Sequence, residues 1–128
     1  MIAAGQGPAE NKNRVIAHLN ANPDLDAVLT LGPTSADPTI LALEEMGLAG
    51  DIYFGTFDLG ENIVKGIKSG IIEWGIDQQP FLQAYLPVVI LANYDRYGVL
   101  PGNNINSGPG FVTADGLEKV EEFAGEFR

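Results

Sequence analysis

The stretch AVLTLGPTSADPTILALEEMGLAGDIYFGT, residues 27–56, contains one complete strand–helix–strand unit. Four of its first five residues are apolar and a Gly-Pro pair follows them, which predicts a buried strand that runs into a turn. Asp37 followed by Pro38 predicts a helix start, because aspartate caps helix N-termini and proline fits the first helical position. We expect this helix to end at Gly47, since glycine is a typical C-terminal stop, and residues 52–56 to form the next strand.

The same alternation continues on both sides of this unit. Before it, Ile2-Ala3-Ala4 predicts a short strand, and residues 11–22 predict an amphipathic helix. After it, residues 61–69 predict a helix and residues 71–76 a strand. Strands joined by crossover helices of about ten residues run in the same direction. The sequence therefore predicts an α/β fold with a doubly wound parallel sheet, flavodoxin-like in kind.

The C-terminal third has a different character. Residues 81–97 predict a long, strongly apolar helix that requires burial on most of its surface, and Pro87 inside it is expected to kink it. Residues 98–114 read as connecting chain with a possible short strand at Ile105, and a last helix is expected to start near Asp115.

The composition is that of one folded domain. The chain has 128 residues, 45% of them hydrophobic, and no cysteine, which excludes thiol catalysis and disulfides. A net charge of −10 repels phosphate backbones and anionic lipid, so nucleic acid is not expected as a partner. The longest apolar run, residues 88–92, is far shorter than the ~20 residues that cross a bilayer, so no membrane insertion is expected.

The N-terminus shows no basic segment followed by an apolar stretch, so no signal peptide is expected in the chain as written. Two explanations stay open at this point. Either the protein remains inside the cell, or its front end is missing.

Polar residues follow the predicted strands at their carboxyl ends, where ligands bind in open parallel sheets. Asp58 follows one strand and Gln78 the next. The carboxylate only accepts hydrogen bonds, whereas the amide donates and accepts, so together they suit a ligand with several hydroxyls, such as a neutral sugar. The alternative is that Asp58 caps the next helix and Gln78 satisfies loop backbone. Trp74 shares strand parity with isoleucines, which favours a place in the core.

Other chemistries find little support in the residues. Gly5-Gln6-Gly7 follows the first predicted strand, but the third glycine of a dinucleotide fingerprint falls on Glu10. His18 is the only histidine and stands in a helix, and no nucleophile elbow accompanies it. Metal ligation lacks a cluster of ligands. We therefore expect neither an enzyme, nor a metal, nor a cofactor.

The order of three motifs resembles a known family. Gly55-Thr56-Phe57-Asp58 is followed by a helix closed by glycine and then by Gln78-Gln79-Pro80, with Asp58 and Gln78 20 residues apart. This order resembles the C-terminal half of type I periplasmic sugar-binding proteins, the ribose-binding-protein-like substrate-binding components of ABC transporters. The resemblance implies a periplasmic protein that binds a monosaccharide or polyol and delivers it to a transporter permease.

The resemblance also implies roles for single residues. Asp58 and Gln78 correspond to side chains that contact sugar hydroxyls. A third family ligand falls on Gly32-Pro33, which leaves Thr34 or backbone groups to replace it.

The resemblance divides the chain in two. Residues 1–79 correspond to most of the C-terminal lobe without its first strand and helix. Residues 80–128 correspond to a helix, the segments that cross the hinge, and a C-terminal helix that normally packs with the N-terminal lobe. Open edges and apolar patches would then favour a homodimer or a swapped assembly. An alternative is the effector-binding domain of a sugar-responsive transcription repressor, which shares this fold.

Overall fold

The structure is a computed structural model that describes residues 1–3, 5 and 7–126. Its centre is a four-stranded sheet in the order β1-β2-β3-β4. The first three strands are parallel, and β4 runs antiparallel to β3. The strands are β1 (Ala27–Thr30), β2 (Tyr53–Phe57), β3 (Trp74–Asp77) and β4 (Gly110–Val112). The predicted α/β fold, a mainly parallel sheet alternating with helices, is confirmed.

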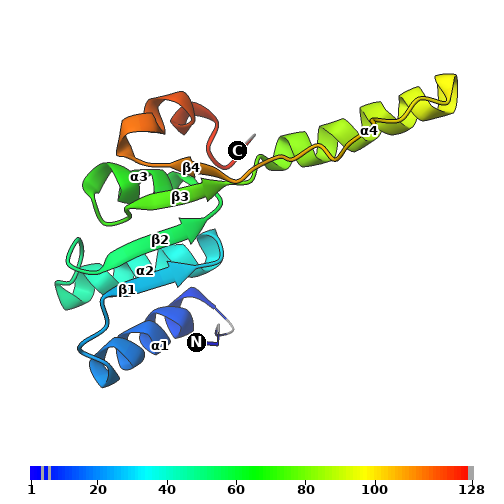
Figure 1. The fold of residues 1–128 in the computed structure, drawn as a ribbon. Coiled ribbons are helices and arrows are strands. Elements are labelled where there is room, and N and C mark those ends of the chain that lie inside the picture. Colours follow the sequence, from blue (N-terminus) through cyan, green and yellow to red (C-terminus); the bar gives the residue numbers. More distant parts are fainter. Residues whose placement is uncertain (4, 6, 127–128) are drawn as a thin grey trace.

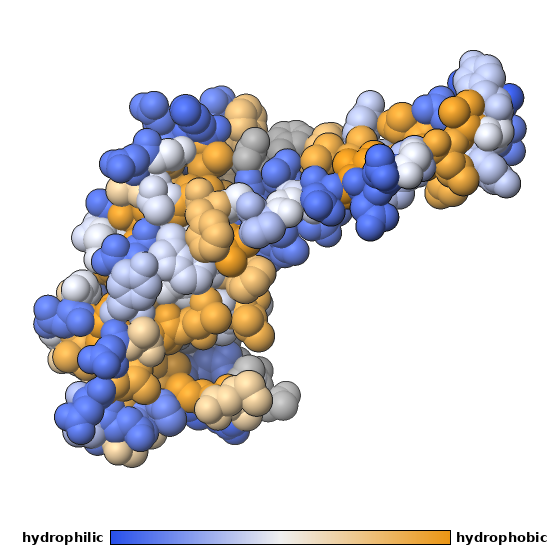
Figure 2. Space-filling view, viewed as in Figure 1, coloured by the Kyte–Doolittle hydropathy of each residue, from blue (hydrophilic) through white to orange (hydrophobic). Residues whose placement is uncertain are grey.

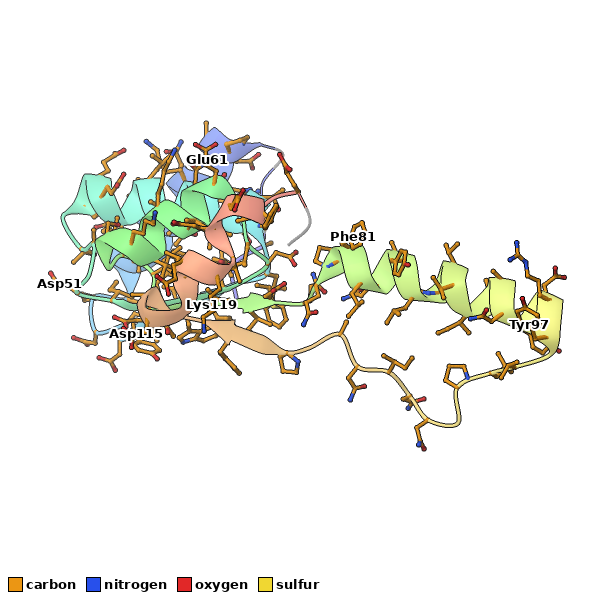
Figure 3. The ribbon with its side chains drawn as sticks, turned by 90° about the horizontal axis from the view of Figure 1, so that it is seen from above. Asp51, Glu61, Phe81, Tyr97, Asp115 and Lys119 are labelled. Carbon is orange, nitrogen blue, oxygen red and sulfur yellow. The ribbon has the colours of Figure 1, made fainter. Side chains whose placement is uncertain are left out.

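Four α-helices and two short 3₁₀ helices accompany the sheet: α1 (Pro8–Ala21), α2 (Pro33–Met46), α3 (Glu61–Ser69), α4 (Pro80–Tyr97), η1 (Ala114–Lys119) and η2 (Glu121–Phe123). Helices α1, α2 and α3 form one layer on one side of the sheet (Figures 1 and 3). The core lies between this layer and the sheet, and its largest fully buried side chains include Phe54, Leu43 and Ile63. Asp58 and Gln78, which follow β2 and β3, lie at the carboxyl ends of these strands, where ligands bind in open parallel sheets.

Helices α2 and α3 end at their glycines, as predicted, but two helices begin earlier than expected. Helix α1 begins at Pro8 rather than at residue 11 and ends at Ala21. Gly47 and Gly70 end α2 and α3 in the left-handed conformation, with φ of 68° and 75°. The predicted start of α2 at Asp37-Pro38 is wrong, because α2 begins at Pro33 and Pro38 lies inside it. Both prolines fit a first helical turn, and the chain uses the earlier one.

Several predicted strand positions are also corrected. Ile2 and Ala3 lie outside any strand, and Ala4 is outside the described residues. The third strand begins at Trp74 rather than at residue 71, because the N–H groups of residues 71 and 72 donate to Gly66 O and close α3. A strand requires a neighbour to pair with, and this depends on the tertiary structure.

The C-terminal predictions need correction as well. Ile105 is not in a strand. Instead, part of the supposed connecting chain is β4, which pairs Val112 with Gly75 and Gly110 with Asp77. The expected final helix is replaced by the 3₁₀ helices η1 and η2.

Helix α4 projects from the sheet as an arm, with the returning chain beside it (Figure 1). It runs unbroken through Pro87 and has no buried residue. Large apolar side chains are exposed along it, among them Tyr85, Val88 and Leu91. A hollow of about 430 Å³ lies between α4 and the returning chain. No described helix is both long and apolar enough to span a bilayer.

One ion pair gives the fold a small dependence on pH. In α3, Lys65 Nζ donates to Glu61 Oε1 at 2.5 Å. This hydrogen bond and the charge of Lys65 lower the pKa of the Glu61 carboxyl. A lowered pKa stabilises the fold above the unfolded-state pKa, and this contribution is lost as the pH falls through the folded-state value. Both groups are exposed, so the effect is small.

We expect Lys65→Met to remove this part of the acid dependence. The measurement is the urea midpoint of both proteins at neutral pH and at pH below the pKa of Glu61. The gap between the two midpoints should be larger at neutral pH than in acid. A gap of the same size at both pH values would contradict the assignment.

Candidate functional site

The carboxyl ends of β1, β2 and β3 lie at one edge of the sheet and bring three turns together. Asp58 follows β2 and Gln78 follows β3. Gln78 Nε2 donates a hydrogen bond to Asp58 Oδ1 at 2.5 Å. Both side chains are half-buried. The structure therefore brings together the two residues that the sequence singled out.

The backbone at Asp58 is held in a left-handed turn. Its φ is 60°, a conformation that aspartate and asparagine adopt more readily than most residues. Its N–H continues the pairing with β3 by donating to Ile76 O at 2.9 Å. Asp58 does not cap the helix that follows it. The N-cap of α3 is Gly60, and no side chain makes a capping hydrogen bond there. The Asp58 carboxylate instead faces Gln78.

The exit of β1 leaves space beside this carboxylate. Gly32 is buried and has a φ of 141°, which side chains rarely tolerate, and a Cβ built there would lie 3.8 Å from Asp58 Oδ2. Thr34 follows in the first turn of α2 and is exposed. Among the hydrogen bonds of the described residues, none joins Thr34 to the Asp58–Gln78 pair. Thr34 thus stands at the same edge without contributing to the pair itself.

Residues beyond the predicted set hold Gln78 in place. The Asp77 side chain is 2% exposed, and its Oδ1 accepts the N–H of Gln79 at 2.8 Å. Gln79 has a φ of 56° and is the N-cap of α4, and Gln83 Nε2 donates to Gln78 O at 2.7 Å. The signal for this turn is an aspartate two residues before the backbone N–H that it accepts. The turn directs the amide of Gln78 toward Asp58.

Polar groups below the pair are also satisfied. Thr30 Oγ1 donates to Thr56 Oγ1 at 2.7 Å in the interior. This bond joins Thr30, the last residue of β1, to its register partner on β2, so neither hydroxyl is left without a partner.

Aromatic side chains, which could stack on a sugar ring, do not gather at this edge. Tyr53 and Trp74 are the first residues of β2 and β3, at the opposite end of the sheet. Trp74 is half-buried rather than in the core, because it pairs with Gly55 on the face of the sheet opposite to that of the core residue Phe54. Only Phe57, which is half-buried, adjoins Asp58.

The pair of Asp58 and Gln78 offers hydrogen-bonding groups to a ligand. A carboxylate and an amide offer acceptors and donors to hydroxyl groups. Among residues 1–3, 5 and 7–126, no three histidine, aspartate or glutamate side chains gather as a metal site. Gln6, the residue considered at the first predicted strand exit, lies outside the described residues.

Comparison with known proteins places the chain in a family. The model of the periplasmic binding protein domain matches residues 2–96, so the chain belongs to the periplasmic binding protein family. This is a family of binding proteins rather than enzymes.

Several relatives are similar over nearly all of the chain. A xylose/arabinose-binding protein of Sulfolobus acidocaldarius is 26% identical over 92% of the chain and 31% of its own length. The carbohydrate transporter structure of Acidothermus cellulolyticus in complex with myo-inositol is 30% identical, with a TM-score of 0.83, over 94% of this chain and 42% of that one. An ABC transporter solute-binding protein of Agrobacterium vitis with bound D-fucose is 23% identical, with a TM-score of 0.77, over 90% and 39%. The chain thus spans well under half the length of these relatives.

Proposed function

We propose that the chain is the greater part of one lobe of a sugar-binding protein that serves an ABC transporter. In this proposal, residues 1–79 form most of the C-terminal lobe without its opening strand and helix. Residues 80–128 cross to a second lobe and return, and the exposed apolar surface of α4 packs there. The projection of α4 without a buried residue supports this division. The whole protein would work in the periplasm and deliver its ligand to a membrane permease.

The ligand is a neutral monosaccharide or polyol. The observation that carries this proposal is the hydrogen bond between Asp58 and Gln78 at the strand ends. Asp58 accepts from sugar hydroxyls, Gln78 donates or accepts, and Thr34 or nearby backbone replaces the side chain that Gly32 lacks. The similar structures from Acidothermus cellulolyticus and Agrobacterium vitis are complexes with myo-inositol and D-fucose, which supports the same class of ligand. A carboxylate in the site also disfavours anionic sugars.

The lobe alone is expected to bind weakly. A second lobe would supply further contacts and exclude water, and the open edge does neither. We expect a ¹⁵N-HSQC titration of the chain with myo-inositol to shift the amide signals around Asp58 and Gln78, with a dissociation constant above the micromolar range. Sub-micromolar affinity by calorimetry would contradict the lobe assignment.

Asp58→Ala tests the site directly. We expect it to weaken this binding by about 10- to 100-fold, because a hydrogen bond to a charged group contributes about 1.5–3 kcal/mol. Asp51→Asn is the control, since Asp51 is exposed just before β2, at the other end of the sheet. Unchanged binding in Asp58→Ala, or shifts that map to the α4 hollow, would overturn the assignment.

A further inference from the structure

A carboxylate is buried at the end of β3, directly before the candidate ligand residue Gln78. Among the residues that the structure describes, Asp77 is the only charged one that is buried, with 2% of its surface exposed. Residues two apart on a strand share a face, so Asp77 lies on the same face as Gly75, where a Cβ would meet Leu59 and Ile67 of the core. A carboxylate in such a place is costly unless it is hydrogen-bonded. Its hydrogen bonds therefore indicate what it is for.

The carboxylate of Asp77 shapes the turn that carries Gln78. Asp77 Oδ1 accepts the N–H of Gln79 at 2.8 Å, and the charge of the acceptor strengthens this bond. Gln79 has a φ of 56°, a left-handed conformation that residues with a side chain rarely adopt. The bond closes a ring around Gln78 and fixes the backbone on both sides of it. The direction of the Gln78 side chain thus depends on Asp77.

The returning chain holds the backbone of Asp77 itself. Strand β4 pairs Gly110 with Asp77. A Cβ at Gly108 would lie 3.1 Å from Asp77 O and 3.6 Å from Gln78 Cα, so the returning chain packs closely on this part of β3. The carboxylate therefore acts on the turn from a fixed position.

Helix α4 contacts the turn from its other side. Gln83 Nε2 donates to Gln78 O at 2.7 Å, and the N–H of Gln83 donates to Gln79 O at 3.1 Å. None of the residues of α4 is buried, and Figure 2 shows hydrophobic side chains on the surface of the projecting arm. The arm therefore adds hydrogen bonds to the turn but no core packing, and the buried Asp77 is the anchor of the turn.

We propose that Asp77 is a positioning residue of the sugar site, which aims the amide of Gln78 at Asp58 and at the ligand through the turn at Gln79. This rests on the proposed function, in which Gln78 binds ligand hydroxyls. Gln78 Nε2 already donates to Asp58 Oδ1 at 2.5 Å, and groups that are held in place before binding lose less freedom when the ligand arrives. Asp77 is buried away from the ligand, so its effect on affinity passes through Gln78.

The side-chain amide signal of Gln78 in the ¹⁵N-HSQC spectrum of the ligand-free chain tests this positioning. The signal is assigned by its loss in Gln78→Ala, and Asp58→Ala gives its position without the acceptor. We expect Asp77→Ala to shift the signal toward that position. Asp77→Asn should leave the signal in place, because asparagine keeps a side-chain oxygen that accepts the N–H of Gln79.

The affinity for myo-inositol, measured by titration in the same spectra, tests the consequence. Asp77→Ala should raise the dissociation constant about tenfold, and Asp77→Asn should raise it by less than about twofold. In the Gln78→Ala background, Asp77→Ala should have no further effect, because the residue through which it acts is absent. Asp37→Ala is the control: it also removes a carboxylate that accepts a side-chain hydrogen bond, from Asn62 Nδ2 at 3.0 Å, but this bond joins α2 to α3.

An unchanged Gln78 signal in Asp77→Ala would overturn the proposal. Equal losses of affinity in Asp77→Ala and Asp77→Asn would do the same, as would an equal effect of Asp77→Ala with and without Gln78. A wild-type chain that does not bind myo-inositol would overturn the proposed function instead, and the Gln78 signal would still decide whether Asp77 aims this side chain. Circular dichroism checks each fold. If Asp77→Ala does not fold, Asp77→Leu replaces it, since leucine suits a buried position and lacks the acceptor.

Discussion

Replacement of Phe54 by alanine is expected to lower the free energy of unfolding by about 3–5 kcal/mol. Phe54 has no exposed surface and belongs to the core between the sheet and its helix layer. The substitution removes the largest fully buried side chain and leaves a cavity that the surrounding elements fill only in part. Small domains are stable by about 5–15 kcal/mol, so much of the stability would be lost. Urea unfolding followed by circular dichroism measures the change.

Phe81→Ala is the matched control for this prediction. Phe81 is 50% exposed and stacks on Tyr85 of the same helix, with ring centres 5.8 Å apart. Its replacement should change stability by less than about 1 kcal/mol. If the two variants lost similar amounts, Phe54 would not be at the centre of the core and the packing described for β2 would be wrong.

Gly55→Ala is expected to destabilise the chain by about 2–3 kcal/mol, through overpacking rather than through a cavity. A Cβ at Gly55 would lie 2.3 Å from Trp74 Cζ2, and two further ring atoms would be within 2.6 Å. The ring would have to leave its place over β2 and its edge-on contact with Phe111. Because Trp74 is the only tryptophan, its emission should shift to longer wavelength as it becomes more exposed.

Gly102→Ala serves as the control for this substitution. No atom lies within 4 Å of a Cβ at Gly102, so neither stability nor emission should change appreciably. A stable Gly55→Ala protein with unchanged emission would show that the indole does not lie over Gly55. It would also remove one of the two contacts that place Trp74 on the face of the sheet away from the helices.

Local patterns were sufficient for much of the secondary structure. Gly47 and Gly70 end their helices because glycine alone reaches the left-handed conformation without strain. The bounds of α3 were predicted to the residue, and its C-terminal end follows from this property of Gly70. The start of α2 was not, because Pro33 and Pro38 both satisfy the rule for a first helical position and only packing selects between them.

The candidate site, too, was predicted from the sequence only in part. Asp58 and Gln78 could be found from the sequence because each directly follows an apolar strand, and parallel strands place such residues at one edge. The hydrogen bond between them and the turn through Asp77 that holds Gln78 depend on atoms that meet only in the fold. The role of Thr34 stays a prediction, since the structure places it at the edge but not in the pair.

The amino-acid order therefore decided the α/β class, the helix ends and the two polar residues at the strand ends, since each depends on neighbours within a few positions along the chain. Tertiary structure alone decided the pairing of β4 with β3, the projection of α4 and the exposure of Leu29 and Tyr53 on the sheet. These features depend on which surfaces meet across long sequence separations. An apolar residue such as Leu29 or Val88 has the same local preference whether a partner covers it or water does.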